Sequence, residues 1–208
     1  ELMSEGIQPD IVACRCQHQV IDKVREKISV FANVPMERVV SVHDVDSIYL
    51  LPTLLRKYKL DEQTIQFLGL QNRAKIDETA KNEWENYVYK LLGLEKEITI
   101  GITGKYTSLR DSYASIIKAL EHAGTHFGAN VNLKWIDTTF LSEEKAATEL
   151  AGLNGILVPG AFGSRGAEGK ITCIKYAREN KIPYLGLCFG FQMAVVEYAR
   201  NVCGLAEA

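Results

Sequence analysis

Residues 183–192 read Pro-Tyr-Leu-Gly-Leu-Cys-Phe-Gly-Phe-Gln, a pattern that predicts a strand, a sharp turn and a helix in succession. In this Gly-x-Cys-x-Gly motif, Cys188 stands between Gly186 and Gly190. Glycines on both sides let neighbouring backbones pass closely, and a helix N-terminus favours a thiolate and offers N–H groups to a developing oxyanion. The motif is therefore the thiol form of a nucleophile elbow. A buried cysteine in a tight turn is the alternative that this spacing leaves open.

The residues before this turn alternate between strand-like and helix-like patterns with short connections. Such alternation predicts a parallel sheet covered on both faces, with right-handed crossovers, and hence a doubly wound α/β domain. In these sheets ligands bind where strands end and helices begin. Strands are predicted at 98–102, 131–136, 155–158 and 183–187, and helices at 111–123, 142–150, 166–180 and 190–202.

An earlier part of the chain has its own pattern, with predicted strands at 10–14 and 39–42 and helices at 21–31, 48–57 and 80–91. Pro52 interrupts the second of these helices. We expect a first domain at 1–70, a helical linker at 71–97 and a second domain at 98–208. Because the first residue is Glu rather than Met, we also expect the chain to be part of a longer protein.

The composition is that of ordinary globular material. The chain has 208 residues, 24 Lys and Arg against 26 Asp and Glu, and 47% hydrophobic positions, which excludes disorder and low complexity. A net charge of −2 gives no electrostatic argument for nucleic acid or an anionic membrane, and no apolar run has the length of a membrane helix. Five scattered cysteines do not form the pattern of a disulfide framework, so a reducing, intracellular setting is expected.

Two further glycine-rich turns follow predicted strands. The turn at 159–163 can bring a backbone N–H near a ligand and, with the amide of Phe189, complete an oxyanion hole. A dinucleotide fingerprint there is excluded because its first glycine would fall on Ala161. The turn at 101–106 imitates a P-loop but lacks glycine at Thr99 and Ser or Thr at Tyr106.

No histidine is an evident base for Cys188. All four histidines precede it, and His122 and His126 are predicted to be surface residues at the end of a helix. Cys14, Cys16 and His18 share one face if they lie on a strand, so a soft-metal site is conceivable. A fourth ligand is missing nearby, and a buried strand end is the favoured interpretation, so no metal site is predicted.

Several short sequence segments, which no general requirement of folding explains, resemble segments of a known family. The chain resembles CTP synthases, in the same order and at compatible spacing, over nearly its whole length. The resemblance implies the C-terminal part of a P-loop-like amidoligase domain, a helical linker, and the first half of a doubly wound class I glutamine amidotransferase domain. The segments are Gly-Ile-Gln-Pro-Asp at 6–10, His-Asp-Val-Asp-Ser-Ile-Tyr at 43–49, Gly-Lys-Tyr at 104–106, Asp-Ser-Tyr at 111–113, Leu-Val-Pro-Gly at 157–160 and Gly-Leu-Cys at 186–188.

The resemblance also implies roles for individual residues. Cys188 matches the nucleophile that attacks the glutamine amide and forms a γ-glutamyl thioester while ammonia is released. Lys27 matches a lysine that meets the phosphates of UTP or CTP. Glutamine-binding positions match Ala161, Phe189, Gly190, Phe191 and Gln192, and an adenine-contacting loop of the ATP site matches His43, Asp44 and Val45, with Arg15 as a further candidate beside it.

By the same resemblance, the full protein is a cytoplasmic enzyme of pyrimidine nucleotide biosynthesis that aminates UTP to CTP. It uses ATP and Mg²⁺, with magnesium ligands outside this chain, and GTP as an allosteric activator. Its members form homotetramers and filaments. No nucleic acid or membrane partner is expected.

Three departures from the family pattern bear on activity. Ala161 stands where the family has glycine, which would be strained if the backbone there has a positive φ. Phe189 and Phe191 stand where Leu and Met are typical. The family's phosphate-binding segment and its His-x-Glu pair are absent from the sequence, so the 208 residues alone are expected to be inactive. A degenerate, non-catalytic binding or assembly subunit is the alternative function.

Overall fold

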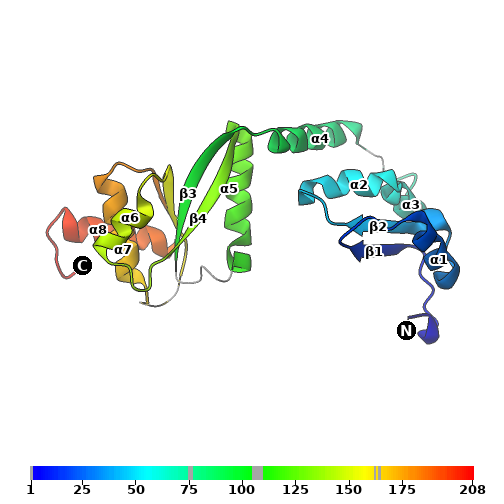
Figure 1. The fold of residues 1–208 in the computed structure, drawn as a ribbon, viewed down its shortest axis with the longest axis horizontal. Helices are drawn as coiled ribbons and strands as arrows, with labels where there is room; N and C mark the ends of the chain where they lie inside the picture. The colour runs from blue at the N-terminus through cyan, green and yellow to red at the C-terminus, as the bar shows by residue number, and fades with distance from the viewer. Residues whose placement is uncertain (1, 75–76, 105–109, 162, 164) are drawn as a thin grey trace. The chain divides into compact units, whose positions relative to one another are not determined.

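The computed structural model describes residues 2–74, 77–104, 110–161, 163 and 165–208. The chain divides into two compact units, Glu1–Tyr89 and Lys90–Ala208, and each has its own parallel sheet (Figure 1). Within the described residues, no helix has the length and apolar character needed to cross a membrane.

The first unit is built on two parallel strands, β1 (Val12–Cys16) and β2 (Val39–His43), connected through α1 (Asp22–Ala32). Their register pairs Val12 with Val39 and Cys16 with His43. Helix α1 ends because Asn33 adopts the left-handed conformation, with φ of 51°, that terminates many helices. Three short 3₁₀ helices complete this part: η1 (Leu2–Glu5), η2 (Met36–Arg38) and η3 (Ile48–Leu50).

The remaining helices of this unit are α2 (Leu51–Lys57), α3 (Leu60–Phe67) and α4 (Glu78–Leu92), the last of which extends beyond Tyr89. Pro52 lies in the first turn of α2, where a missing backbone N–H breaks no intrahelical bond, so it starts this helix rather than interrupting it. Helix α3 was not predicted, because its eight residues are mostly polar and carry little helical periodicity.

Aromatic side chains connect the first half of α4 to η3. The ring of Trp84 lies 5.7 Å from that of Tyr49, and its indole N–H donates to the Tyr49 carbonyl at 2.9 Å. The ring of Tyr87 packs edge-on against Tyr49 at 5.5 Å. This part of α4 therefore belongs to the first unit, and the division between the units falls inside the helix. The separate linker at 71–97 stays a prediction.

The second unit is the predicted doubly wound α/β arrangement. Four parallel strands, β3 (Lys96–Gly104), β4 (Ala129–Asp137), β5 (Gly155–Val158) and β6 (Tyr184–Gly186), lie in the order β4-β3-β5-β6. The connection after β3 runs to one side of the sheet and the later ones to the other, so the strand order reverses between β3 and β5. The carboxyl ends of the strands at this reversal form the crevice where such folds bind ligands.

Helices η4 (Arg110–Tyr113), α5 (Ala114–Phe127), α6 (Glu143–Leu150), α7 (Ala167–Glu179) and α8 (Phe189–Asn201) accompany this sheet (Figure 1). Each follows a strand, as the sequence predicted. The Arg178 guanidinium on α7 holds both carboxylate oxygens of Glu197 on α8, with its Nη2 2.8 Å from Oε1. Glu197 is 1% exposed, so this contact fixes the two helices against each other. The buried core consists of Ile136, Ala146, Leu150, Leu153, Ile156, Val158, Cys173, Ile174 and Ala177.

The core predicts that substitutions at two leucines, each the last residue of a helix, differ clearly in their effect on stability. Leu150 is fully buried, whereas Leu92 is 52% exposed. Leu150→Ala is expected to lower the stability of the second unit by about 3 kcal/mol, because it removes buried methyl groups and leaves a cavity. Leu92→Ala is expected to change it by no more than about 0.5 kcal/mol. Native-state hydrogen exchange of the β5 amides measures both, and equal effects would contradict this account of the core.

Candidate active site

Cys188 occupies a strained turn between β6 and α8. Its φ of 51° and ψ of −109° lie outside the regions that L-amino acids favour, and its side chain is exposed. A residue held in such a conformation costs about 1–3 kcal/mol, and this kind of strain is concentrated at active sites. The sequence prediction of a sharp strand-to-helix turn that presents the thiol is therefore confirmed.

The two flanking glycines are needed because other backbone atoms pass within contact distance. A Cβ atom at Gly190 would lie 2.0 Å from the Val158 carbonyl oxygen, and one at Gly186 would lie 2.6 Å from the Phe191 nitrogen. The same Val158 oxygen accepts a hydrogen bond from the Leu187 N–H at 2.9 Å. The start of α8 thus lies directly on the end of β5, as the glycine spacing predicted.

The turn after β5 lies beside the nucleophile. A Cβ atom at Gly160 would be 3.6 Å from the Cys188 Cβ, an ordinary van der Waals contact, so the two segments lie next to each other at this point. Ala161 follows immediately and is partly buried. Among the described non-glycine residues, positive φ occurs at Asn33, Lys59, Lys181 and Cys188, so the alanine is not held in a left-handed backbone. Its methyl group causes no strain of the kind considered above.

Backbone N–H groups and a buried hydroxyl shape the other side of the site. Phe189 is the first residue of α8, so its N–H has no partner within the helix and lies at the positive end of the helix dipole. The Tyr184 hydroxyl donates to the Gly190 carbonyl at 2.7 Å, and burial raises the pKa of this hydroxyl, so it remains a donor. Gln192 donates its N–H to the Cys188 carbonyl at 3.1 Å, and its side chain is exposed.

The charged neighbour of this turn, Lys170 on α7, was missed by sequence reasoning. Its side chain is 1% exposed, and its Nζ lies 5.0 Å from the centroid of the Phe189 ring. The side chain of a lysine in the first turn of a helix is normally solvated, and no local sequence pattern indicates that this one is buried. Only the tertiary packing of α7 against the start of α8 reveals it.

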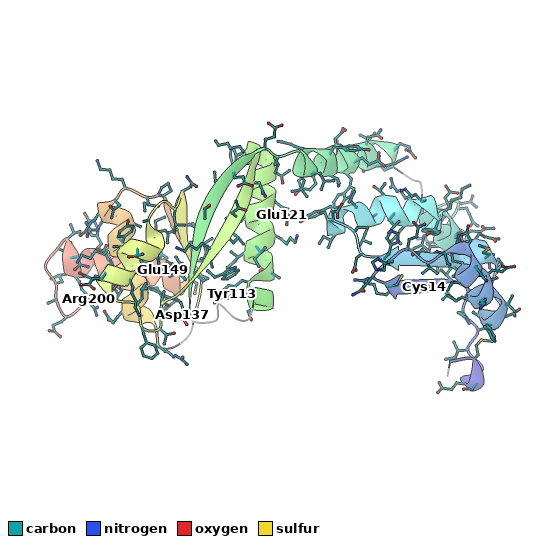
Figure 2. The ribbon with its side chains drawn as sticks, viewed as in Figure 1. Cys14, Tyr113, Glu121, Asp137, Glu149 and Arg200 are labelled. Atoms are coloured by element: carbon teal, nitrogen blue, oxygen red, sulfur yellow. The ribbon has the colours of Figure 1, made fainter. Side chains whose placement is uncertain are left out.

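The histidines agree with their predicted surface placement. His122 and His126 are exposed on α5, and the Lys90 ammonium donates to the His126 carbonyl at 2.7 Å. Across the part of the chain that the structure describes, no group of three His, Cys, Asp or Glu side chains is arranged to hold a metal. Cys14 (Figure 2) instead packs on β1, where burial and the neighbouring Cys16 raise the pKa of its thiol against the opposing effect of Arg25.

The residues predicted for an ATP site meet at the carboxyl ends of β1 and β2. The Arg15 Nη2 forms an ion pair with Asp44, and Arg15 Nη1 donates to the Cys16 carbonyl at 2.6 Å. The Asp44 N–H bonds the same carbonyl at 3.2 Å. His43 ends β2 one residue before, and Val45 follows Asp44 half-buried. Lys27 lies exposed on α1, and no contact joins it to this group among the described residues.

Ser41 is a second residue that sequence reasoning missed. Its hydroxyl is fully buried, accepts from the Val20 N–H at 2.9 Å and lies 3.1 Å from Nδ1 of His43. Side chains two residues apart on a strand point to the same face. A strand placed at 39–43 would therefore have predicted that Ser41 and His43 lie next to each other. The hydrogen bond orients the imidazole at the strand end.

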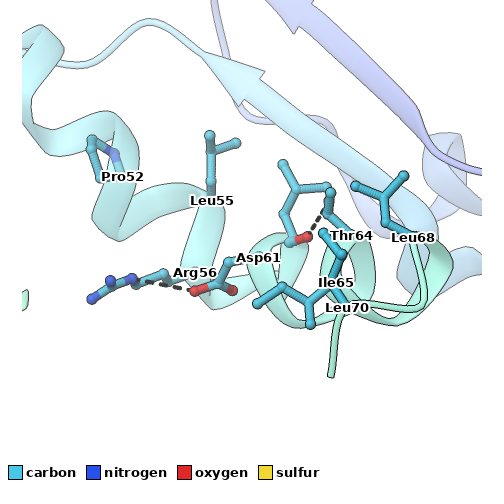
Figure 3. Close-up of a pocket in the computed structure, with 9 residues that line it drawn as sticks. Pro52, Leu55, Arg56, Asp61, Thr64, Ile65, Leu68 and Leu70 are labelled. Carbon is cyan, nitrogen blue, oxygen red and sulfur yellow. Dashed lines mark hydrogen bonds and ion pairs between the residues drawn. The ribbon is translucent and has the colours of Figure 1, made fainter. Parts of the chain in front are cut away.

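An apolar pocket of about 480 Å³ lies between α2 and α3 of the first unit (Figure 3). Leu55, Leu60, Ile65, Leu68 and Leu70 line it, and the Arg56–Asp61 ion pair of 3.4 Å lies at its edge. None of the predicted site residues borders this pocket. Cys188 and its glycine turns are therefore the better candidate for chemistry.

In a helix, a Gly→Ala substitution usually increases stability. The close contact at Gly190 predicts that the substitution lowers stability there. Gly190→Ala is expected to destabilise the second unit by at least about 3 kcal/mol, because the new methyl overlaps the Val158 oxygen. Gly160→Ala meets only an ordinary contact at 3.6 Å and is expected to cost no more than about 1 kcal/mol. Hydrogen exchange at β5 and β6 measures the two. Similar stabilities would show that α8 does not sit on β5 as described.

The cysteines of the second unit predict selective alkylation. Burial raises the pKa of Cys173 to about 12, and its side chain is fully inaccessible, whereas Cys188 is exposed. Iodoacetamide at pH 8 is expected to modify Cys188 and leave Cys173 intact in the folded protein, with Cys173 reacting only in denaturant. The Cys173 thiol keeps its proton to a higher pH in the folded protein than in the unfolded chain, where its pKa is 9.0. Its contribution to the free energy of unfolding is therefore complete below pH 9 and declines as the pH rises above 9. Peptide mass spectrometry reads the outcome, and modification of native Cys173 would contradict it.

Comparisons with known proteins match both units. Residues 108–207 match the glutamine amidotransferase class-I family model, and residues 1–70 match the CTP synthase N-terminus model. CTP synthases from Caldanaerobacter subterraneus subsp. tengcongensis and Methanopyrus kandleri are 46% and 45% identical over all of this chain, which covers 38% of each relative. The solved glutaminase domain of Trypanosoma brucei CTPS with bound acivicin is similar with a TM-score of 0.50 and 36% identity, over 52% of this chain and 43% of that one.

The chain thus spans less than two fifths of the length of these curated relatives. The similarity to them extends over the whole chain and so includes both units. The two family models match in the order that the resemblance implied. On these findings both parts of the chain are similar, over the whole of its length, to CTP synthases.

Proposed function

We propose that the complete protein carrying this chain is a glutamine-hydrolysing CTP synthase, which aminates UTP with ammonia released at Cys188 and with ATP as the phosphoryl donor. The observation that carries the proposal is the strained, exposed Cys188 at the N-terminus of α8, beside the turn of Gly160. A nucleophile so placed suits acyl transfer from a carboxamide. The relatives with the same continuous likeness are named CTP synthases.

In the first half-reaction the Cys188 sulfur attacks the side-chain amide carbon of glutamine. The carbonyl oxygen becomes an oxyanion, which the Phe189 N–H and the turn at Gly160 are placed to stabilise. The carbon–nitrogen bond then breaks, ammonia leaves with a proton, and a γ-glutamyl thioester remains. Water hydrolyses the thioester to glutamate and restores the thiol. The family resemblance assigns the base to a His-x-Glu pair, which this sequence does not contain.

The glutamine side of the site is proposed at Ala161, Phe189, Gly190, Phe191 and Gln192. These residues flank Cys188 on the turn after β5 and on the first turn of α8. Phe191 is 63% exposed and Gln192 is exposed, so both are available to a ligand. The Ala161 backbone needs no left-handed conformation, so alanine there is compatible with the proposed role.

The nucleotide sites are proposed in the first unit. His43, Asp44 and Val45 with Arg15 form the proposed adenine side of an ATP site, supported by the Arg15–Asp44 ion pair and the Ser41 hydrogen bond to His43. Lys27, exposed on α1, is proposed to meet UTP or CTP phosphates as a compact positive charge. On the family resemblance alone, Mg²⁺ is proposed to bind residues outside this chain.

Three family properties are also proposed for the complete protein: activation by GTP, assembly into homotetramers and filaments, and a cytoplasmic location. They rest on the family alone. No observation on the described residues favours the alternative of a non-catalytic binding or assembly subunit.

The decisive experiment replaces Cys188 by serine in the complete gene product, with Cys203→Ser as the control for another exposed cysteine. Cys188→Ser is expected to lower glutamine-dependent CTP formation by at least about 10³-fold, because the thioester cannot form at a useful rate. Synthesis from added ammonium chloride is expected to remain. Cys203→Ser is expected to leave both reactions unchanged.

Acivicin, the compound bound to the Trypanosoma brucei domain, serves as the second probe. One equivalent is expected to label Cys188 in the wild-type protein and to stop ammonia release from glutamine. Glutamine hydrolysis that survives in Cys188→Ser, or a complete gene product that makes no CTP from UTP with either nitrogen source, would overturn the proposal.

A further inference from the structure

Lys170 is the side chain of the second unit whose burial most needs an explanation. It lies in the first turn of α7 at 1% exposure, among the largest fully buried side chains of the chain. Removing an ammonium from water is costly unless nearby groups compensate for the lost hydration. A lysine kept in such a place therefore points to a use for its charge.

One group that faces this charge is the ring of Phe189, next to Cys188. The Lys170 Nζ lies 5.0 Å from the ring centroid, within the range of a cation–π interaction, which is stronger when it is shielded from water. Phe189 directly follows Cys188 and supplies the backbone N–H at the start of α8. The ring is joined to this nitrogen through Cβ and Cα, so a contact that fixes the ring also restrains the residue that carries the proposed oxyanion donor.

The position of Lys170 is itself rigid. A Cβ atom at the neighbouring Gly169 would lie 2.2 Å from the Thr138 carbonyl oxygen, so the first turn of α7 is packed onto the residue that follows β4. The Lys170 N–H also bonds the Gly166 carbonyl at 3.1 Å. The backbone from which the Lys170 side chain extends is thus packed against the residue that follows β4.

We propose that Lys170 is a positioning residue for glutamine hydrolysis, which acts through the ring of Phe189 to aim the Phe189 N–H at the oxyanion. This inference rests on the proposed function of Cys188. It also gives a reason for phenylalanine at position 189, since the leucine typical of the family has no aromatic face to bind a cation. The two residues are therefore expected to work as a pair.

A double-mutant cycle in the complete gene product tests the pairing, with wild type, Lys170→Met, Phe189→Leu and the double variant. Lys170→Met is expected to lower kcat for glutamine hydrolysis about 10-fold, with KM for glutamine changed by less than about 3-fold. In the Phe189→Leu background, the same substitution is expected to change kcat by less than about 2-fold, since the ring it acts on is gone. Equal losses in both backgrounds would overturn the proposal.

Iodoacetamide alkylation of Cys188 separates positioning of the N–H from general damage. This displacement at carbon forms no oxyanion, so its rate and pH profile are expected to stay within about 2-fold of wild type in Lys170→Met. A parallel loss in alkylation and hydrolysis would mean that Lys170 only maintains the fold, and would overturn the positioning role.

Lys170→Arg, which keeps a cation, is expected to retain kcat within about 3-fold of wild type, and it keeps the test decisive if the methionine variant does not fold. A kcat for Lys170→Arg as low as that of a folded charge-free variant, Lys170→Gln, would count against the proposal. Failure of the proposed function looks different: the wild-type protein would then neither hydrolyse glutamine nor react with acivicin at Cys188, which would overturn both inferences together.

Discussion

The Val158 carbonyl oxygen, at the end of β5, makes the contacts on which the turn around Cys188 depends. It accepts the Leu187 N–H at 2.9 Å and lies so close to Gly190 that no side chain fits there. Strand β5 therefore fixes both the last residue before the nucleophile and the first turn of α8. Strand β5 is paired on both sides, by β3 and β6. The backbone geometry of Cys188 is therefore fixed by an interior strand of the sheet.

Much of this arrangement could be predicted because it is local. A β-branched or apolar run, a glycine pair around a cysteine and a following helical period lie within ten residues of one another, and they led to the strand, elbow and helix that the structure shows. Helix α3 had no such signal, since its few apolar residues do not recur at helical spacing. The contacts of Ser41 with His43 and of Lys170 with Phe189 depend on strand register and on helix packing, which no single segment encodes.

The two units use the same edge of a parallel sheet in different ways. In the first unit, charged and imidazole side chains gather at the ends of β1 and β2, where an ion pair and a hydroxyl orient them. In the second, the corresponding edge presents backbone N–H groups and a thiol, and polar side chains have a supporting role. Side-chain charge suits the recognition of a nucleotide, while preorganised backbone donors suit a short-lived oxyanion.

The positive φ of Cys188 has a consequence for how this sequence changes over time. At such a backbone angle glycine is the residue of lowest conformational energy, so random substitution under selection for folding alone would drift toward glycine. Cysteine persists there only while its sulfur contributes to fitness. A cysteine at this backbone angle is therefore the outcome expected if selection favours the proposed reactivity of its sulfur over stability.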